Sequence, residues 1–254
     1  MTYWYYPGCT LKAVAAEFER SALCCARLLG LSLEELPQWQ CCGGVSTMAK
    51  DEAAPRLASI RALASCGETP LVTLCSACHN VLKQTNYDLA HDLALSERAS
   101  NYLETEYHGE TKVLHFLELL RDEVGFAQIR SAVKAPFTGK KIAPYYGCLL
   151  LRPEKVLQFD DPEQPRILSD FLSALGAEPV YFPLWNECCG GYAVTQDQEL
   201  CTHRRNTVAE SAREWGAQAL ITACPLCYYH ISKTKMPVYY FTELLEQALG
   251  GKQS

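Results

Sequence analysis

The sequence predicts an α/β protein of two pseudo-symmetric, Rossmann-like domains, each with a parallel sheet and with cysteines at the C-terminal edges of its strands. Two observations favour this fold class. Strand-like and helix-like segments alternate along the chain, which is typical of parallel sheets with right-handed crossovers. One pattern of five cysteines also occurs twice in the 254 residues, and a repeated pattern indicates a repeated structural unit.

The first half of the chain follows a β-α-β-α-β order. Strands are expected at residues 2–6, 71–74 and 112–116, and a short apolar run occupies residues 31–37. A helix after the first strand, ending at Gly30, is indicated by apolar residues at helical spacing: Leu11, Val14, Phe18, Ala22, Cys25 and Leu29. A second amphipathic helix carries Ala53, Leu57, Ile60 and Ala64, and a long helical stretch follows Cys78.

The second half repeats this order. Its strands are expected at about residues 142–146, 178–182, 219–223 and 237–240. The helix after Cys227 is shorter, because the equivalent of residues 88–110 is missing. Between the halves, AVKAPFTGKK (132–141) contains proline, glycine and a basic pair, which are typical of a linker. We therefore expect an N-terminal domain over residues 1–131 and a C-terminal domain over residues 139–254.

The composition excludes several classes of protein. A formal net charge of −6 leaves no surplus of Lys and Arg to neutralise phosphates, so no binding of nucleic acid is expected. The N-terminal residues MTYWYYPGCT lack the basic and apolar regions of a signal peptide. No stretch approaches the roughly 20 apolar residues of a transmembrane helix. The expected protein is cytoplasmic, without direct insertion into a membrane.

Fourteen cysteines are many for such a chain, and ten of them form two copies of one pattern. The first copy reads C-x31-CC-x32-C-x2-C and the second reads C-x39-CC-x34-C-x2-C, with Gly-Gly after each vicinal pair. The flanking residues match as well: YYPGC (5–9) with YYGC (145–148), LVTLCSAC (71–78) with LITACPLC (220–227), and VLHFLELL (113–120) with VYYFTELL (238–245). Without a signal peptide, metal binding or redox chemistry is favoured over structural disulfides.

The cysteines of each copy follow predicted strands. The carboxyl ends of parallel strands share one edge, where ligands gather, so the five thiols are expected to meet there. Zinc is one alternative, although a closed zinc site uses four ligands rather than five. A thioredoxin-type dithiol at Cys75 and Cys78 is another, and it leaves the vicinal pairs unexplained. Iron–sulfur ligation uses every thiolate, and the glycine pairs let the backbone approach the sulfurs.

The two cysteine sets resemble those of the B subunits of the heterodisulfide reductase family, whose cysteine-rich domains are called CCG. The likeness covers nearly the whole chain, including VLHFLELLRDEVG (113–125) and YYGCLLLRPEKVLQFDDPEQP (145–165), although the spacing from Cys42 to Cys75 is slightly shorter than in the archaeal type. The resemblance implies one noncubane [4Fe-4S] cluster per set, with all five cysteines as ligands. The implied ligands of the first cluster are Cys9, Cys41, Cys42, Cys75 and Cys78. The implied ligands of the second cluster are Cys148, Cys188, Cys189, Cys224 and Cys227.

The function implied by this resemblance is that of the catalytic iron–sulfur subunit of a heterodisulfide reductase-like complex. A disulfide, on a small molecule or a carrier protein, is cleaved between the two clusters by one-electron steps to give two thiols. The implied partners are a C-like iron–sulfur subunit and an A-like flavoprotein, because the chain has no G-x-G-x-x-G motif for flavin or nicotinamide. The alternative is a CCG electron-transfer subunit of another complex, of the lactate, glycolate, quinone or folate type, without disulfide cleavage. A zinc-stabilised interaction module is a third class.

Other chemically capable residues lie outside the repeated pattern. A structural role is expected for four cysteines in predicted helices that have no counterpart in the other half: Cys24, Cys25, Cys66 and Cys201. Four strand tyrosines are expected to pack within the sheets: Tyr5, Tyr6, Tyr145 and Tyr146. His79 and His230 follow the C-x-x-C units and are interpreted as structural helix-start residues, with donation to a sulfur as the alternative.

Overall fold

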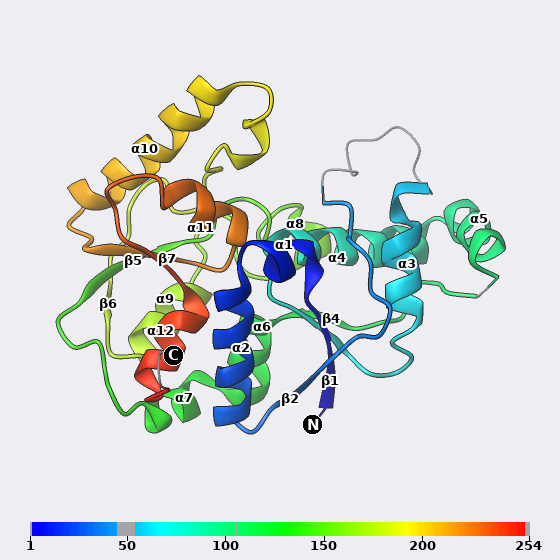
Figure 1. The fold of residues 1–254 in the computed structure, drawn as a ribbon, viewed down its shortest axis with the longest axis horizontal. Coiled ribbons are helices and arrows are strands. Elements are labelled where there is room, and N and C mark those ends of the chain that lie inside the picture. Colours follow the sequence, from blue (N-terminus) through cyan, green and yellow to red (C-terminus); the bar gives the residue numbers. More distant parts are fainter. Residues whose placement is uncertain (1, 45–53, 105, 252–254) are drawn as a thin grey trace.

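The computed structural model describes residues 2–44, 54–104 and 106–251, which form two four-stranded parallel sheets with helices around them (Figure 1). The first sheet has the strand order β2-β1-β3-β4, and the second has the equivalent order β6-β5-β7-β8. Every strand pairing within these two sheets is parallel. The predicted α/β class with two similar parallel sheets is confirmed.

The first half contains one sheet and the helices that cover it. Its strands are β1 (Thr2–Tyr6), β2 (Ser32–Glu35), β3 (Leu71–Thr73) and β4 (Val113–His115). Its helices are α1 (Gly8–Ala13), α2 (Ala16–Leu28), η2 (Ala54–Arg56), α3 (Leu57–Ala64), α4 (Ser76–His91) and α5 (Leu93–Leu103). Three short helices then lead toward the second sheet: α6 (Phe116–Leu119), η3 (Leu120–Val124) and α7 (Phe126–Ala132).

The second half repeats the arrangement with shorter elements. Its strands are β5 (Lys141–Tyr145), β6 (Glu178–Pro179), β7 (Ala219–Thr222) and β8 (Val238–Tyr240). Its helices are α8 (Glu154–Leu157), α9 (Ile167–Ala174), η4 (Gly191–Ala193), α10 (Gln198–Glu214), α11 (Pro225–Ile231) and α12 (Phe241–Ala248). The helix after the second C-x-x-C unit is the shorter one, as expected, with 7 residues in α11 against 16 in α4. The division into domains 1–131 and 139–254 stays a prediction.

The strand order explains why the cysteines gather. β1 pairs with β2 on one side and with β3 on the other, so the chain changes direction across the sheet at β1. β5 occupies the same position in the second sheet. Ligands of parallel sheets bind at such switch points, beyond the carboxyl ends of the strands. In each half, the lone cysteine follows the central strand at the switch point, which is β1 or β5. The C-x-x-C unit follows its neighbour, which is β3 or β7.

The single helix predicted over residues 11–29 is divided into α1 and α2. The backbone N–H of Ala15 donates to the carbonyl of Thr10 at 3.0 Å, which closes α1, and a new helix begins at Ala16. Val14 therefore does not lie on the buried side of a helix, contrary to what its spacing predicts, and 76% of its surface is exposed.

The strand predicted at residues 178–182 is shorter than expected. It pairs with β5 only over Glu178–Pro179, after which Val180 donates one more hydrogen bond to Ile142 at 3.0 Å. Glu178 and Val180 donate to β5, so Pro179 lies at a position whose N–H would face the open edge of the sheet, and the ladder ends only after Val180. The second predicted helix of the first half is confirmed as α3, although Ala53 lies outside the described residues.

One hydrophobic core joins the two halves. It contains buried aromatic side chains from both: Phe18, Phe116, Phe171, Tyr240 and Phe241. The ring of Phe18 stacks on that of Tyr240 with centroids 4.2 Å apart, and the rings of Phe116 and Phe241 lie with centroids 6.2 Å apart. Each half also has a smaller core of its own. The two sheets are therefore fixed relative to each other by shared apolar packing.

An ion pair between α2 and α12 adds to this junction. The guanidinium of Arg20 donates to both carboxylate oxygens of Glu246 at 2.7 and 2.9 Å, and the Glu246 side chain is only 2% exposed. Burial favours a raised pKa for Glu246, but the bonds from Arg20 outweigh it and hold the pKa below its ordinary value. The pair therefore stabilises the fold fully above that ordinary pKa, and its contribution is lost as the pH falls through the lowered one.

We expect Arg20→Ala to lower the free energy of unfolding by about 3 kcal/mol, because it leaves a buried carboxylate without its partner. Glu17→Ala is the matched control, since Glu17 is an exposed partner of the same guanidinium at 2.9 Å. Loss of this surface pair is expected to cost less than about 0.5 kcal/mol. Thermal unfolding at neutral pH measures both variants, and equal shifts of the melting temperature would contradict the assignment.

Candidate metal centres

The five cysteines of the first copy meet at the carboxyl edge of the first sheet. Cys9 lies in α1 after β1, Cys41 and Cys42 follow β2, and Cys75 and Cys78 lie at the start of α4 after β3. The sulfurs of Cys9 and Cys41 are 3.4 Å apart, as are those of Cys42 and Cys78. Cys9 and Cys41 are exposed and the other three are buried. The structure thus brings the set together, and its role as a ligand set stays a prediction.

The second copy is arranged in the same way at the second sheet. Cys148 follows β5, Cys188 and Cys189 lie in the loop after β6, and Cys224 and Cys227 lie at the start of α11 after β7. The sulfurs of Cys189 and Cys227 are 3.5 Å apart. All five cysteines line one enclosed hollow.

A strand tyrosine holds the vicinal pair in each copy. The hydroxyl of Tyr145 donates to the carbonyl of Glu187, directly before the second pair, at 2.7 Å. Tyr6 makes the same bond to Gln40, directly before the first pair. The sequence pattern predicted packing within the sheets for these tyrosines and not this bond. The available signal was the repeated Tyr-Tyr before each lone cysteine.

A glycine precedes the lone cysteine in each copy. Gly8 has φ +71° and Gly147 has φ +65°, a backbone conformation that favours glycine. A Cβ on Gly8 would lie 2.7 Å from the sulfur of Cys78, and one on Gly147 would lie 3.0 Å from the sulfur of Cys227. These glycines therefore provide the space that the sulfurs of the C-x-x-C units occupy.

In each set, hydrogen bonds between thiols lower the pKa of some cysteines, such as Cys75 and Cys188, and raise the pKa of others, such as Cys78. In the second set, the backbone N–H of Gly190 donates to the sulfur of Cys188 at 3.3 Å. In the first set, a hydrogen bond from Cys78, helped by backbone N–H groups, lowers the pKa of Cys75 to about 7 despite its burial. Outside the sets, burial raises the pKa of the Cys66 thiol to about 12. Metal ligands and redox centres need the thiolate form.

The thiols outside the two sets have other hydrogen-bond partners. Cys25 donates to the carbonyl of Thr242 at 3.4 Å, and Cys66 to that of Ala62 at 3.2 Å. Cys66 lies just after α3, in a turn rather than in a helix as predicted. Cys201 and Cys24 also have oxygen partners, the carbonyl of Gly190 at 3.0 Å and the carboxylate of Glu246 respectively. These contacts support the expected structural role.

The two histidines differ in their surroundings. His79 lies with Nδ1 3.2 Å from the hydroxyl of Thr73 and with Nε2 3.5 Å from the buried carboxylate of Glu118. The partners of His79 therefore belong to β3 and α6. His230 lies with Nδ1 3.0 Å from the carbonyl of Cys189, so it supports the backbone of the second vicinal pair.

A cavity of about 750 Å³ opens in front of the first set. Its walls come from α1 and α2 on one side and from α11 on the other, which lie beside each other at the centre of Figure 1. Phe18 and Tyr228 meet edge to face there, with ring centroids 4.5 Å apart. The lining is mostly apolar and aromatic, and among the described residues it includes no Asp, Glu, His, Lys or Arg.

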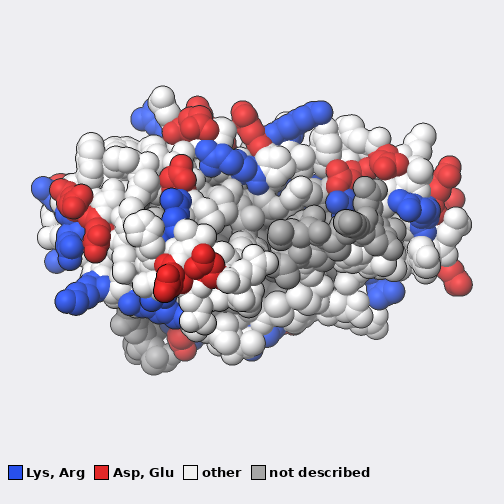
Figure 2. Space-filling view, turned by 90° about the horizontal axis from the view of Figure 1, so that it is seen from above, with Lys and Arg blue, Asp and Glu red and all other residues white. Residues whose placement is uncertain are grey.

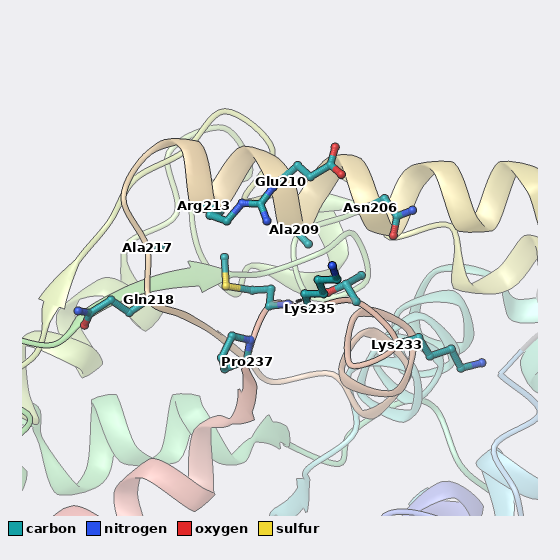
Figure 3. A pocket seen from close by; sticks show the side chains of 11 residues that line it. Asn206, Ala209, Glu210, Arg213, Ala217, Gln218, Lys233, Lys235 and Pro237 are labelled. Atoms are coloured by element: carbon teal, nitrogen blue, oxygen red, sulfur yellow. Dashed lines mark hydrogen bonds between the residues drawn. The ribbon is translucent and has the colours of Figure 1, made fainter.

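A second hollow among the described residues has a different lining. On the face shown in Figure 2, acidic and basic side chains are interspersed. A hollow of about 520 Å³ lies between α10 and the segment before β8 (Figure 3). Its lining includes Glu210, Arg213 and Lys235 and contains no cysteine. This hollow therefore differs in its chemistry from the two cysteine sets at the sheet edges.

The donor sets fit a group with several irons. Within residues 2–44, 54–104 and 106–251, no three Cys, His, Asp or Glu side chains are grouped as the ligands of one metal ion. Thiolates of an iron–sulfur cluster bind different irons, so they surround the group rather than converge on one point. None of the fourteen cysteines, all of which lie in the described residues, forms a disulfide. All ten thiols of the sets are thus available.

Comparison with known proteins agrees with this geometry. The family model of the cysteine-rich domain CCG matches residues 3–83 and 142–232, and each match contains one complete set of five cysteines. The chain belongs to the CCG family. The predicted duplication of the CCG domain is thereby confirmed.

Relatives of this CCG protein span nearly its whole length. The 8-methylmenaquinol:fumarate reductase membrane anchor subunit of Wolinella succinogenes is 31% identical and matches 97% of this chain and 91% of its own. The B subunit of the ferredoxin:CoB-CoM heterodisulfide reductase of Methanosarcina mazei is 24% identical and matches 96% of this chain and 87% of its own. A crystal structure of a hypothetical protein from Helicobacter pylori shares the fold, with a TM-score of 0.77 and 13% identity over 99% of this chain, which spans 49% of that protein.

These findings confirm the predicted relation to the B subunits of heterodisulfide reductases. They support an iron–sulfur electron-transfer subunit that belongs to a multi-subunit oxidoreductase. In the part of the CCG protein that the structure describes, no helix has both the length and the apolar character to cross a membrane.

Proposed function

We propose that this CCG protein is the disulfide-reducing iron–sulfur subunit of an oxidoreductase complex. The observation that supports it most is the pair of five-thiol sets at equivalent sheet edges, one of which opens on a cavity. Each set would hold one noncubane [4Fe-4S] cluster, and such a cluster supplies single electrons. The first would be held by Cys9, Cys41, Cys42, Cys75 and Cys78, and the second by Cys148, Cys188, Cys189, Cys224 and Cys227.

The proposed reaction is cleavage of the S–S bond of a disulfide. The substrate takes up two electrons and two protons and leaves as two thiols. A partner iron–sulfur subunit delivers the electrons and is itself reduced by a flavoprotein. The chain's own contribution is the cavity, in which apolar side chains such as Phe18 and Tyr228 exclude water from the disulfide. The hydroxyl groups of Thr10 and Tyr192 are hydrogen-bond donors in its lining.

The described lining of the cavity includes no charged side chain, which favours a second candidate, electron exchange with an apolar quinol. A quinol is neutral and flat, which suits a cavity with aromatic walls, whereas an anionic disulfide meets no Lys or Arg in the described lining. The Wolinella relative is named for 8-methylmenaquinol. In this reaction the quinol loses two electrons and two protons, and the electrons pass to partner subunits.

Analysis of iron and acid-labile sulfide in anaerobically purified protein tests the cluster proposal. Two [4Fe-4S] clusters predict about eight of each per chain, and zinc in place of iron would overturn the proposal. Electron paramagnetic resonance then separates the two candidates. A new signal on addition of a thiol under oxidising conditions supports disulfide chemistry. No thiol response, together with reduction of the clusters by duroquinol, supports the quinol reaction.

A further inference from the structure

The two cysteine sets differ in what lies in front of them. The first set lines the open cavity, together with Ala77, Tyr192 and Leu226. The second set lines a much smaller and more enclosed hollow, whose walls also include Tyr192 and Leu226. These two side chains, the wall residues, therefore lie between the second set and the cavity.

One position of the repeat accounts for much of this difference. The third residue of the C-x-x-C unit is Ala77 in the first copy and Leu226 in the second. A Cβ on Gly191 would lie 3.0 Å from Cγ of Leu226 and 3.3 Å from the sulfur of Cys189, so the leucine packs directly over that set. A Cβ on the equivalent Gly44 would lie 3.8 Å from Cβ of Ala77. The small alanine leaves the first set open.

Tyr192 completes the wall. It follows the second glycine pair, and its hydroxyl lies 3.9 Å from the position of a Cβ on Gly44, which belongs to the first copy. Tyr192 lines both the cavity of the first set and the hollow of the second set, so its side chain lies between the two.

A direct hydrogen bond connects the two segments that carry the C-x-x-C units. Ser76, the residue after Cys75, donates from its hydroxyl to the carbonyl of Ala223 at 2.9 Å. Ala223 is the residue before Cys224, and both bonded residues are buried. Electron transfer weakens steeply with distance, and this short bonded route suits passage between two groups that do not share a substrate.

We infer that only the first set meets the substrate, whereas the second set passes electrons from behind the wall residues. This inference rests on the proposed function and gives its two clusters different tasks. Both electrons of the reaction cross between the sets one at a time, and the substrate bond changes only beside the first set. The arrangement differs from cleavage between two equally accessible clusters.

Release of iron to a ferrous chelator tests this inference without measuring activity. The probe is bathophenanthroline disulfonate, added anaerobically to the reduced full-length protein. We expect two phases of equal amplitude that differ about tenfold in rate, because buried sites require local opening. Leu226→Ala is expected to bring the slow phase close to the fast one. Ala77→Leu is expected to slow the fast phase by about the same tenfold factor.

Two matched controls distinguish the effect of opening the wall from the effect of a general destabilisation of the protein. Tyr192→Phe keeps an aromatic ring in the wall, and Tyr229→Ala removes an exposed side chain that lines the cavity but not the second hollow. Both variants are expected to leave the slow phase unchanged. A second readout uses thiophenol: one paramagnetic signal shifts in the parent protein, and both signals shift in Leu226→Ala.

Different results would overturn the proposed function and the inference about the wall residues. Protein that contains almost no iron overturns the proposed function. About eight irons per chain that leave in a single phase, with no effect of Leu226→Ala, overturn the inference about the wall and leave the proposed function standing.

Discussion

Replacement of Cys189 by serine is expected to remove about half of the bound iron, because the second cluster is lost and the first remains. The sulfur of Cys189 is buried and lies 3.5 Å from that of Cys227. A serine hydroxyl at neutral pH is protonated and lacks the soft, polarisable character of a thiolate, which iron–sulfur clusters require. Iron and sulfide per chain, with spin quantitation, measure the loss.

Cys201→Ser is the matched control for this substitution. Cys201 is 1% exposed, and its thiol donates to the carbonyl of Gly190, between the second vicinal pair and η4, at 3.0 Å. A serine hydroxyl retains that hydrogen bond, so the iron content is expected to stay at the parent level. If both variants lost the same amount of iron, the assignment of Cys189 as a ligand would be wrong.

Gly8→Ala is expected to deplete the first cluster although no ligand is changed. The added Cβ would lie 2.7 Å from the sulfur of Cys78, and real Cβ atoms essentially never come so close to another heavy atom. The sulfur must therefore leave its position, and the iron content is expected to fall by about half, since each cluster contains four irons. The paramagnetic signal of the second cluster is expected to persist.

Gly30→Ala is the control that separates the steric overlap with the sulfur of Cys78 from the effect of backbone strain. Gly30 has φ +73°, close to the φ +71° of Gly8, but a Cβ there would have nothing within 4 Å. Both variants carry the cost of about 1–2 kcal/mol for an L-residue in this conformation. Only Gly8→Ala is expected to lose iron. Loss of iron from Gly30→Ala as well would attribute the effect to general destabilisation.

The architecture could be predicted because two independent patterns in the sequence agree. Alternating strand and helix patterns placed β1, β3 and β4 within a few residues, and the repeated cysteines marked the same edge in both halves. Short strands with few apolar residues were harder to delimit. The ladder between β6 and β5 ends after Val180, and the helix break before Ala16 depends on one backbone hydrogen bond that no side-chain pattern records.

The thiols of the site could be predicted from the sequence, but the shape of the cavity in front of them could not. CSAC and CPLC were aligned from the sequence, yet the importance of Leu226 against Ala77 depends on how close Gly191 and Gly44 approach in three dimensions. The phenol of Tyr192 likewise belongs to no repeated motif. It reaches the other half only because the two sheets are packed together, and such long-range packing leaves no periodic signal in one sequence.

The core shared by the two halves also has a consequence for synthesis. Phe18 packs on Tyr240, so a face of the N-terminal half stays uncovered until residue 240 has left the ribosome. Nascent chains in this condition expose apolar surface and aggregate readily. The first five thiols emerge long before α12 can dock. We therefore expect iron to enter the first set only after α12 has been synthesised and has packed against α2.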